Sequence, residues 1–138
     1  MQQMVMINSH PQEVYRRQDV LTANSVDLIV MLYDALKKNI ILGRRGIEKK
    51  NVQNAHNHLI KAQEIVTALI NSLDMNYQIS EELLSIYEFA LRSLEDANLH
   101  KDTEPLEPLV EIVDSLRSAW HEISVSNKGS MQWREERA

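Results

Sequence analysis

The stretch that decides the fold is residues 24–49, NSVDLIVMLYDALKKNIILGRRGIEK. Its apolar residues recur every three or four positions, which predicts one long helix because successive helical residues lie about 100° apart around the axis. These apolar residues cover roughly 220° of the helix, whereas a helix packed on one side needs little more than about 100°. We assign a first stripe to the core face, and a second stripe beside it then needs another cover. The first stripe comprises Leu28, Leu32, Ala35, Leu42 and Gly46, and the second comprises Ile29, Tyr33, Leu36, Ile40 and Ile47.

The composition of the chain is that of one ordinary soluble domain. It has 138 residues, of which 43% are apolar and 25% are charged,. Three Gly and three Pro are too few for a β-rich fold with many tight turns, and the absence of Cys excludes disulfides and thiolate chemistry,. The net charge of −5 disfavours a nucleic-acid partner,. Without a signal peptide or a long apolar run, we expect a cytoplasmic protein that does not insert into membranes.

Three more helices follow the first, each marked by an apolar seam with helical spacing,. Asn51 and Ser80 are the predicted N-caps of the second and third helices, because their side chains can accept a free backbone N–H bond. Four helices of similar length with short connections predict an all-α, antiparallel up-down four-helix bundle. The predicted ranges of the later helices are 52–73, 80–99 and, after a start at Pro105 or Pro108, up to Ser124.

The bundle is flanked by two segments of different character. Residues 1–23 predict an N-terminal arm that is too apolar for a solvated tail, and a short extra helix fits residues 12–18,. Residues 24–124 are the predicted bundle. Residues 125–138 lack apolar periodicity and are rich in polar residues, which predicts a flexible, disordered C-terminal tail,.

One histidine offers an alternative function. The run His-Leu-Ile-Lys-Ala from His58 resembles histidine phosphotransfer domains, which are four-helix bundles with an exposed His, a Lys three residues later and a small neighbour. The simpler interpretation of the same residues is a solvated His at the edge of a seam. His56 and His58 are two residues apart on a helix, so they face away from each other and cannot share a metal. The sequence predicts no metal, no cofactor and no catalytic residue, and the chain is not expected to be an enzyme.

The second stripe on the first helix leads to a hypothesis of partner binding. The stripe can be covered by the N-terminal arm, or by the apolar face of a partner helix laid into a groove. The two covers are compatible, because a partner can displace the arm.

Several segments resemble, in order and spacing, the FliS family of flagellin-specific export chaperones. The resemblance covers roughly residues 15–123. The segments that carry it are VLTA (20–23), LIVMLYD (28–34), KAQEI (61–65), SLD (72–74), LSIYEF (84–89) and EDANL (95–99), with Asp102 and the pair Ala119-Trp120. The chain has Asn24-Ser25 where the family usually has Ser-Pro at the start of this helix.

The resemblance implies a helical bundle without catalytic activity that binds the C-terminal segment of flagellin in the cytosol. It implies that this segment is disordered beforehand, folds into helices on the chaperone, and is thereby kept from premature polymerisation and delivered to the type III export gate. An arm that occupies the groove of the empty chaperone is also implied. Homodimerisation through an empty groove stays open, as does the alternative of a generic helical adaptor.

On this basis we expect the arm to be anchored over a groove on the first helix, with a further contact from the third helix. Phe89 is included because it is a large apolar residue on a charged helix side,. The predicted client-binding residues are Tyr15, Val20, Leu21, Ile29, Tyr33, Leu36, Ile40, Tyr87, Phe89 and Leu91.

Overall fold

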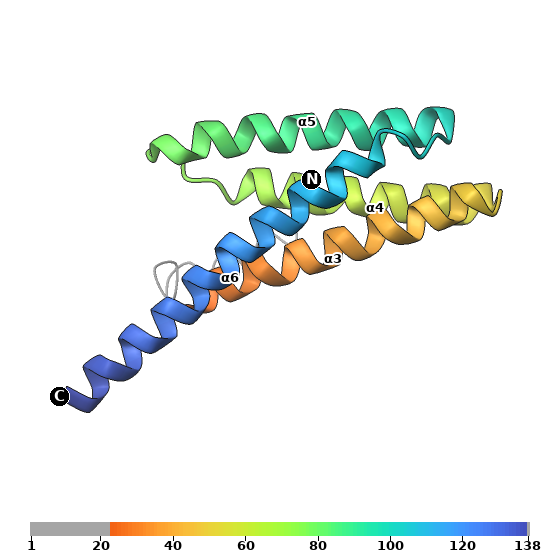
Figure 1. The fold of residues 1–138 in the computed structure, drawn as a ribbon. Coiled ribbons are helices and arrows are strands. Elements are labelled where there is room, and N and C mark those ends of the chain that lie inside the picture. The colour runs from red at the N-terminus through yellow and green to blue at the C-terminus, as the bar shows by residue number, and fades with distance from the viewer. Residues whose placement is uncertain (1–22, 138) are drawn as a thin grey trace. The chain divides into compact units, whose positions relative to one another are not determined.

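The computed structural model describes the backbone of residues 23–137 and the side chains of residues 26–126. This part of the chain forms four helices and no strand (Figure 1). The prediction of an all-α four-helix protein is confirmed, whereas the predicted arm lies outside the described residues, apart from Ala23 at the start of the first helix. The helices are α3 (Ala23–Glu48), α4 (Val52–Asn71), α5 (Gln78–His100) and α6 (Leu106–Arg137).

The chain divides into two compact units. One unit is Leu32–Leu116, which holds most of α3, all of α4 and α5, and the start of α6. The other unit joins Met1–Met31 to Arg117–Ala138. Within this second unit, the hydroxyl of Ser124 donates a hydrogen bond to a carboxylate oxygen of Asp27, which ties the last helix to the first.

Within Leu32–Leu116, successive helices run in opposite directions, as an up-down bundle requires (Figure 1),. Apolar side chains spaced three or four residues apart on each helix fill its core,. The charged surface adds an ion pair between α3 and α6, in which Lys37 Nζ lies 2.8 Å from Asp114 Oδ1. The fully enclosed large side chains of this unit are Tyr33, Ile40, Leu59, Val66, Leu69, Leu94, Leu106 and Leu109.

The two predicted N-caps have different outcomes. Asn51 is the N-cap of α4, because its Oδ1 accepts a hydrogen bond of 3.1 Å from the backbone N–H of Asn54,. Ser80 is not a cap, and that prediction was wrong. Helix α5 begins earlier, at Gln78, and the buried Ser80 hydroxyl donates a 2.6 Å bond to the carbonyl of Asp74, so it closes the preceding turn instead.

The last helix also differs from its predicted bounds. It begins at Leu106, directly after Pro105, and it continues to Arg137 rather than ending near Ser124. The predicted end was too early because it relied on apolar periodicity, which stops there. Residues 125–137 contain no Pro and a single Gly, and their Gln, Met, Arg and Glu residues favour a helix without an apolar face,.

The turn between α3 and α4 is tight and has a Schellman geometry. The N–H of Asn51 donates to the carbonyl of Gly46 (2.8 Å) and that of Lys50 donates to the carbonyl of Ile47 (3.0 Å),. Lys50 takes the left-handed conformation, with φ of 61°, at the position where Gly is usual,. The turn therefore brings the end of α3 and the start of α4 close together with a lysine at its apex.

Candidate functional site

The two apolar stripes of α3 have exchanged the roles that we predicted for them. Tyr33, Leu36 and Ile40 of the second stripe are 0%, 2% and 1% exposed, so this stripe is the core face. Leu28 of the first stripe is 42% exposed, and Leu32 is half-buried. Our assignment of the core face was therefore wrong, and the more open stripe is the one that we had placed inside.

The glycines of α3 show where α4 approaches this helix most closely. A Cβ on Gly46 would lie 2.8 Å from the backbone nitrogen of Ala55, and a Cβ on Gly43 would lie 2.7 Å from Leu59 Cδ2. Helix α4 therefore packs directly against α3 at Gly43 and Gly46, at a distance that a larger residue in either position would not allow.

Tyr33 and Tyr87, both predicted to bind the client, meet inside the bundle instead. Their hydroxyl oxygens lie 2.5 Å apart and form a buried hydrogen bond between α3 and α5. Burial raises the pKa of Tyr87, and the hydrogen bond from Tyr33 opposes that rise in pKa,. The pair is a polar contact of the core, and neither ring can reach a partner while the bundle stays closed.

Three half-buried residues of the first stripe, with the half-buried Asn39 between them, form the candidate site. We call this site the outer stripe and define it as Leu32, Ala35, Asn39 and Leu42. They follow one another at intervals of three and four residues, which places them in one row along α3. Such a row can seat the apolar face of a partner helix. The apolar spacing of the outer stripe was visible in the sequence, but spacing alone could not show which of the two stripes of α3 faces the core.

The one polar member of the outer stripe, Asn39, is hydrogen-bonded to its neighbours. Asn39 Nδ2 donates to the carbonyl of Ala35 at 2.9 Å, and Asn39 Oδ1 accepts a bond of 3.0 Å from Nδ1–H of His58 on α4. These bonds engage both the nitrogen and the oxygen of the Asn39 amide. The same bond engages Nδ1 of the half-buried His58, and no observation on the described residues favours the phosphotransfer alternative.

The remaining predicted residues do not form one surface. Phe89 is 40% exposed and Leu91 is half-buried, but residues two apart on a helix point roughly 200° away from each other,. Ile29 is half-buried and belongs to the other compact unit. The three arm residues, Tyr15, Val20 and Leu21, lie outside the described residues.

Two further searches cover only the part of the chain that the structure describes. No three His, Asp or Glu side chains there gather closely enough to hold a metal ion. None of the helices there combines the length and the apolarity that crossing a membrane requires.

Comparison with known proteins points to one family. The family described as "Flagellar protein FliS" matches residues 6–127. The chain is 31% identical over 123 residues to the flagellar secretion chaperone FliS of Bacillus subtilis, covering 89% of this chain and 92% of the relative. It is 29% identical over 108 residues to the protein of the same name from Salmonella typhimurium, covering 76% and 80% of the two chains. A relative of that name from Vibrio cholerae is 28% identical over 98 residues, covering 70% and 72%.

Proposed function

Since this chain belongs to the FliS family of flagellar secretion chaperones, we propose that its client is the C-terminal segment of flagellin. The client segment arrives unfolded and forms a helix whose apolar face lies along the outer stripe. The observation that carries this proposal is the row of half-buried residues on α3, because residues at this spacing can seat the apolar face of a helix,.

The energy of such binding is sufficient without any chemical step. Each Leu-sized side chain that the complex buries contributes about 1.5–3 kcal/mol. A segment that folds on binding loses about 2–5 kcal/mol to ordering. Several contacts along Leu32, Ala35 and Leu42, each already half-buried, can exceed this cost when the client adds apolar side chains of its own.

We further propose that the bound client cannot polymerise and that the loaded complex, formed in the cytoplasm, is delivered to the export gate. No catalytic role is proposed. When no client is bound, the arm covers the outer stripe, with Tyr15, Val20 and Leu21 as its anchors. A second copy of the chain is the competing occupant of the empty stripe.

The stripe is tested by Ala35→Glu, which introduces a long charged side chain into the middle of the row. Ala35 is half-buried, and Glu is a good helix former, so the bundle is expected to stay folded,. We expect wild type and a cognate flagellin segment to form a 1:1 complex with a gain in helical circular dichroism, and Ala35→Glu to bind at least about tenfold more weakly.

Ser85→Glu is the matched control, because Ser85 is exposed on α5 and lies outside the outer stripe. Light scattering after size-exclusion chromatography measures how much complex each variant forms with the flagellin segment. Equal binding by wild type and Ala35→Glu would place the client elsewhere. A stable dimer that does not bind the flagellin segment would show that the stripe serves self-association.

The arm is tested separately by removing residues 1–22. If the arm covers the stripe, its removal should raise the association rate of the flagellin segment, because no displacement step remains. Stopped-flow fluorescence of a labelled segment measures this rate. An unchanged rate would contradict a covering arm while leaving the stripe itself in place.

A further inference from the structure

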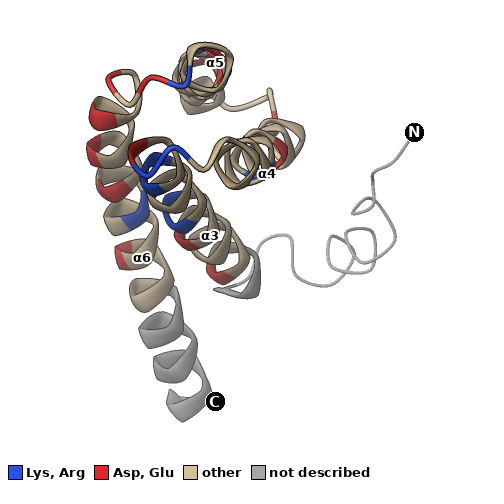
Figure 2. Cartoon of the chain, turned by 90° about the vertical axis from the view of Figure 1, so that its right-hand side faces the viewer, with Lys and Arg blue, Asp and Glu red and all other residues tan. Residues whose placement is uncertain are grey.

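The helical hairpin formed by α3 and α4 carries a charge opposite to that of the chain. Residues 35–63 contain seven of the 15 Lys and Arg residues but only one of the 20 Asp and Glu residues, Glu48. Figure 2 shows blue residues along the second half of α3 and in the turn that leads to α4, and red residues on α6. A chain with a net charge of −5 therefore presents one basic element.

The basic charge is densest where α3 ends. Arg44, Arg45, Lys49 and Lys50 stand within seven residues, and with Glu48 they give this stretch a net charge of +3. In the described part of the chain, none of these four cations has a carboxylate within ion-pair distance, unlike the Lys37 ammonium on the same helix. Among the described residues, therefore, no carboxylate balances their charge.

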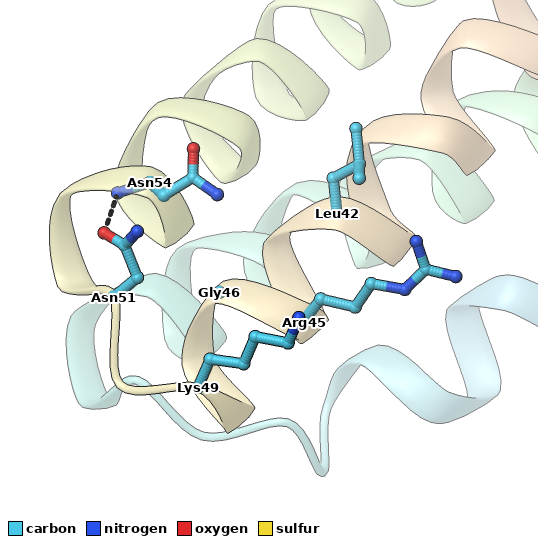
Figure 3. Close-up of a pocket in the computed structure, with 6 residues that line it drawn as sticks. All are labelled: Leu42, Arg45, Gly46, Lys49, Asn51 and Asn54. Carbon is cyan, nitrogen blue, oxygen red and sulfur yellow. Dashed lines mark hydrogen bonds between the residues drawn. The ribbon is translucent and has the colours of Figure 1, made fainter.

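An open cavity of about 360 Å³ lies between the end of α3 and the start of α4, and two of these four cations, Arg45 and Lys49, line it (Figure 3). Leu42 forms an apolar wall, Arg45 and Lys49 supply positive charge, and no carboxylate lines the cavity. The side-chain oxygen of Asn51 is already engaged by the backbone N–H of Asn54, which leaves its amide N–H groups as donors. The lining thus offers guanidinium, ammonium and amide donors, the set that binds a carboxylate.

We propose that the α3–α4 turn is a second docking surface, which binds an acidic protein segment with one of its carboxylates in this cavity. Charge complementarity selects such a segment, because the acidic remainder of the chain repels it from other faces. Residues 35–63 contain no Phe, Tyr or Trp, so the hairpin lacks the aromatic platforms that stack nucleic-acid bases and the aromatic anchors typical of membrane-surface helices,.

The docking surface adjoins the outer stripe at Leu42, but its charged groups lie beyond the stripe. Arg45 and Lys49 can therefore be changed without altering the residues proposed to seat flagellin. The double variant Arg45→Gln/Lys49→Gln removes both cavity charges. The control Lys61→Gln/Arg92→Gln removes the same net charge. It leaves the cavity unchanged, because neither of these exposed residues lines it.

The probe is a synthetic peptide of alternating Glu and Leu residues, titrated into the ¹⁵N-labelled full chain and followed by NMR. We expect the side-chain signals of Arg45, Asn51 and Asn54 to shift, and binding to weaken as salt rises because exposed charges are screened. The cavity variant should bind at least about tenfold more weakly, and the control within about twofold of wild type. Circular dichroism confirms that both variants are folded.

The proposal is overturned if the cavity variant binds the peptide as wild type does, or if the shifted signals map to another face. It is also overturned if phosphatidylglycerol vesicles or single-stranded DNA bind at the turn while the peptide does not. The cavity variant is expected to keep its complex with the flagellin segment. A failed peptide titration therefore leaves the proposed client function standing.

Discussion

At the residue scale, the Tyr33–Tyr87 contact sets the polar pattern of the core. Each phenol is almost fully buried, and the Tyr87 hydroxyl bonds to Tyr33 across the bundle. Replacing both Tyr residues by Phe removes the donor and the acceptor of this hydrogen bond together. Replacing one of them leaves the other hydroxyl buried without this hydrogen bond. The contact thus fixes the pairing of α3 with α5 more than it adds net stability.

The single variant Tyr33→Phe is expected to lower the free energy of unfolding by about 1–3 kcal/mol, because the buried Tyr87 hydroxyl loses its partner,. The double variant Tyr33→Phe/Tyr87→Phe should recover part of this loss, and Tyr77→Phe, at a 58% exposed position, should change little. Urea unfolding followed by circular dichroism measures all three. Additive losses in the double variant would mean that the hydroxyls do not depend on each other.

At the element scale, the glycines of α3 determine how closely it packs on α4. Gly46→Ala should lower stability by about 1–3 kcal/mol, because its Cβ would meet the backbone of Ala55, which cannot move aside,. Gly43→Ala should cost less, because its Cβ meets the side chain of Leu59 and the gain in helix propensity is about 1 kcal/mol,. Thermal unfolding compares them, and equal melting temperatures would show that the helices are not in close contact at Gly46.

The same elements show how far the sequence predicts this fold. Helical spacing, short connections and the Asn51 cap predicted the number and order of the helices and the approximate bounds of the first three. The choice between the two stripes of α3 was not predictable from spacing, since both are apolar and adjacent. That choice depends on how the other helices pack on α3, and it is seen only in the burial of Tyr33, Leu36 and Ile40. The exposure of Phe89 was predicted, but not its separation from Leu91.

The revised stripe assignment also changes the expected behaviour of the candidate site. Leu36 is 2% exposed, so a charge there would disrupt the core, whereas Ala35 one residue earlier is half-buried on the outer stripe,. A partner can therefore be displaced by changing Ala35 without unfolding the bundle. The predicted contacts at Tyr33, Leu36 and Ile40 would require the bundle to open first.

At the scale of the whole molecule, apolar and basic surfaces occupy neighbouring parts of one helical hairpin. In the function that we propose, the outer stripe provides apolar area for a helix that folds on binding. The basic turn provides long-range attraction for acidic segments, which affects the rate and the specificity of association more than its strength. Both surfaces belong to the compact unit Leu32–Leu116, which keeps its own core of four helical segments.

The central claim is that a flagellin segment folds along the outer stripe, and methyl NMR tests it most directly. The chain is labelled at its Leu methyl groups and titrated with an unlabelled C-terminal segment of a cognate flagellin. The account predicts large shifts for Leu32 and Leu42 and little change for Leu99, which is 78% exposed on α5. Shifts centred on Leu99, with Leu32 and Leu42 unmoved in a 1:1 complex, would contradict it.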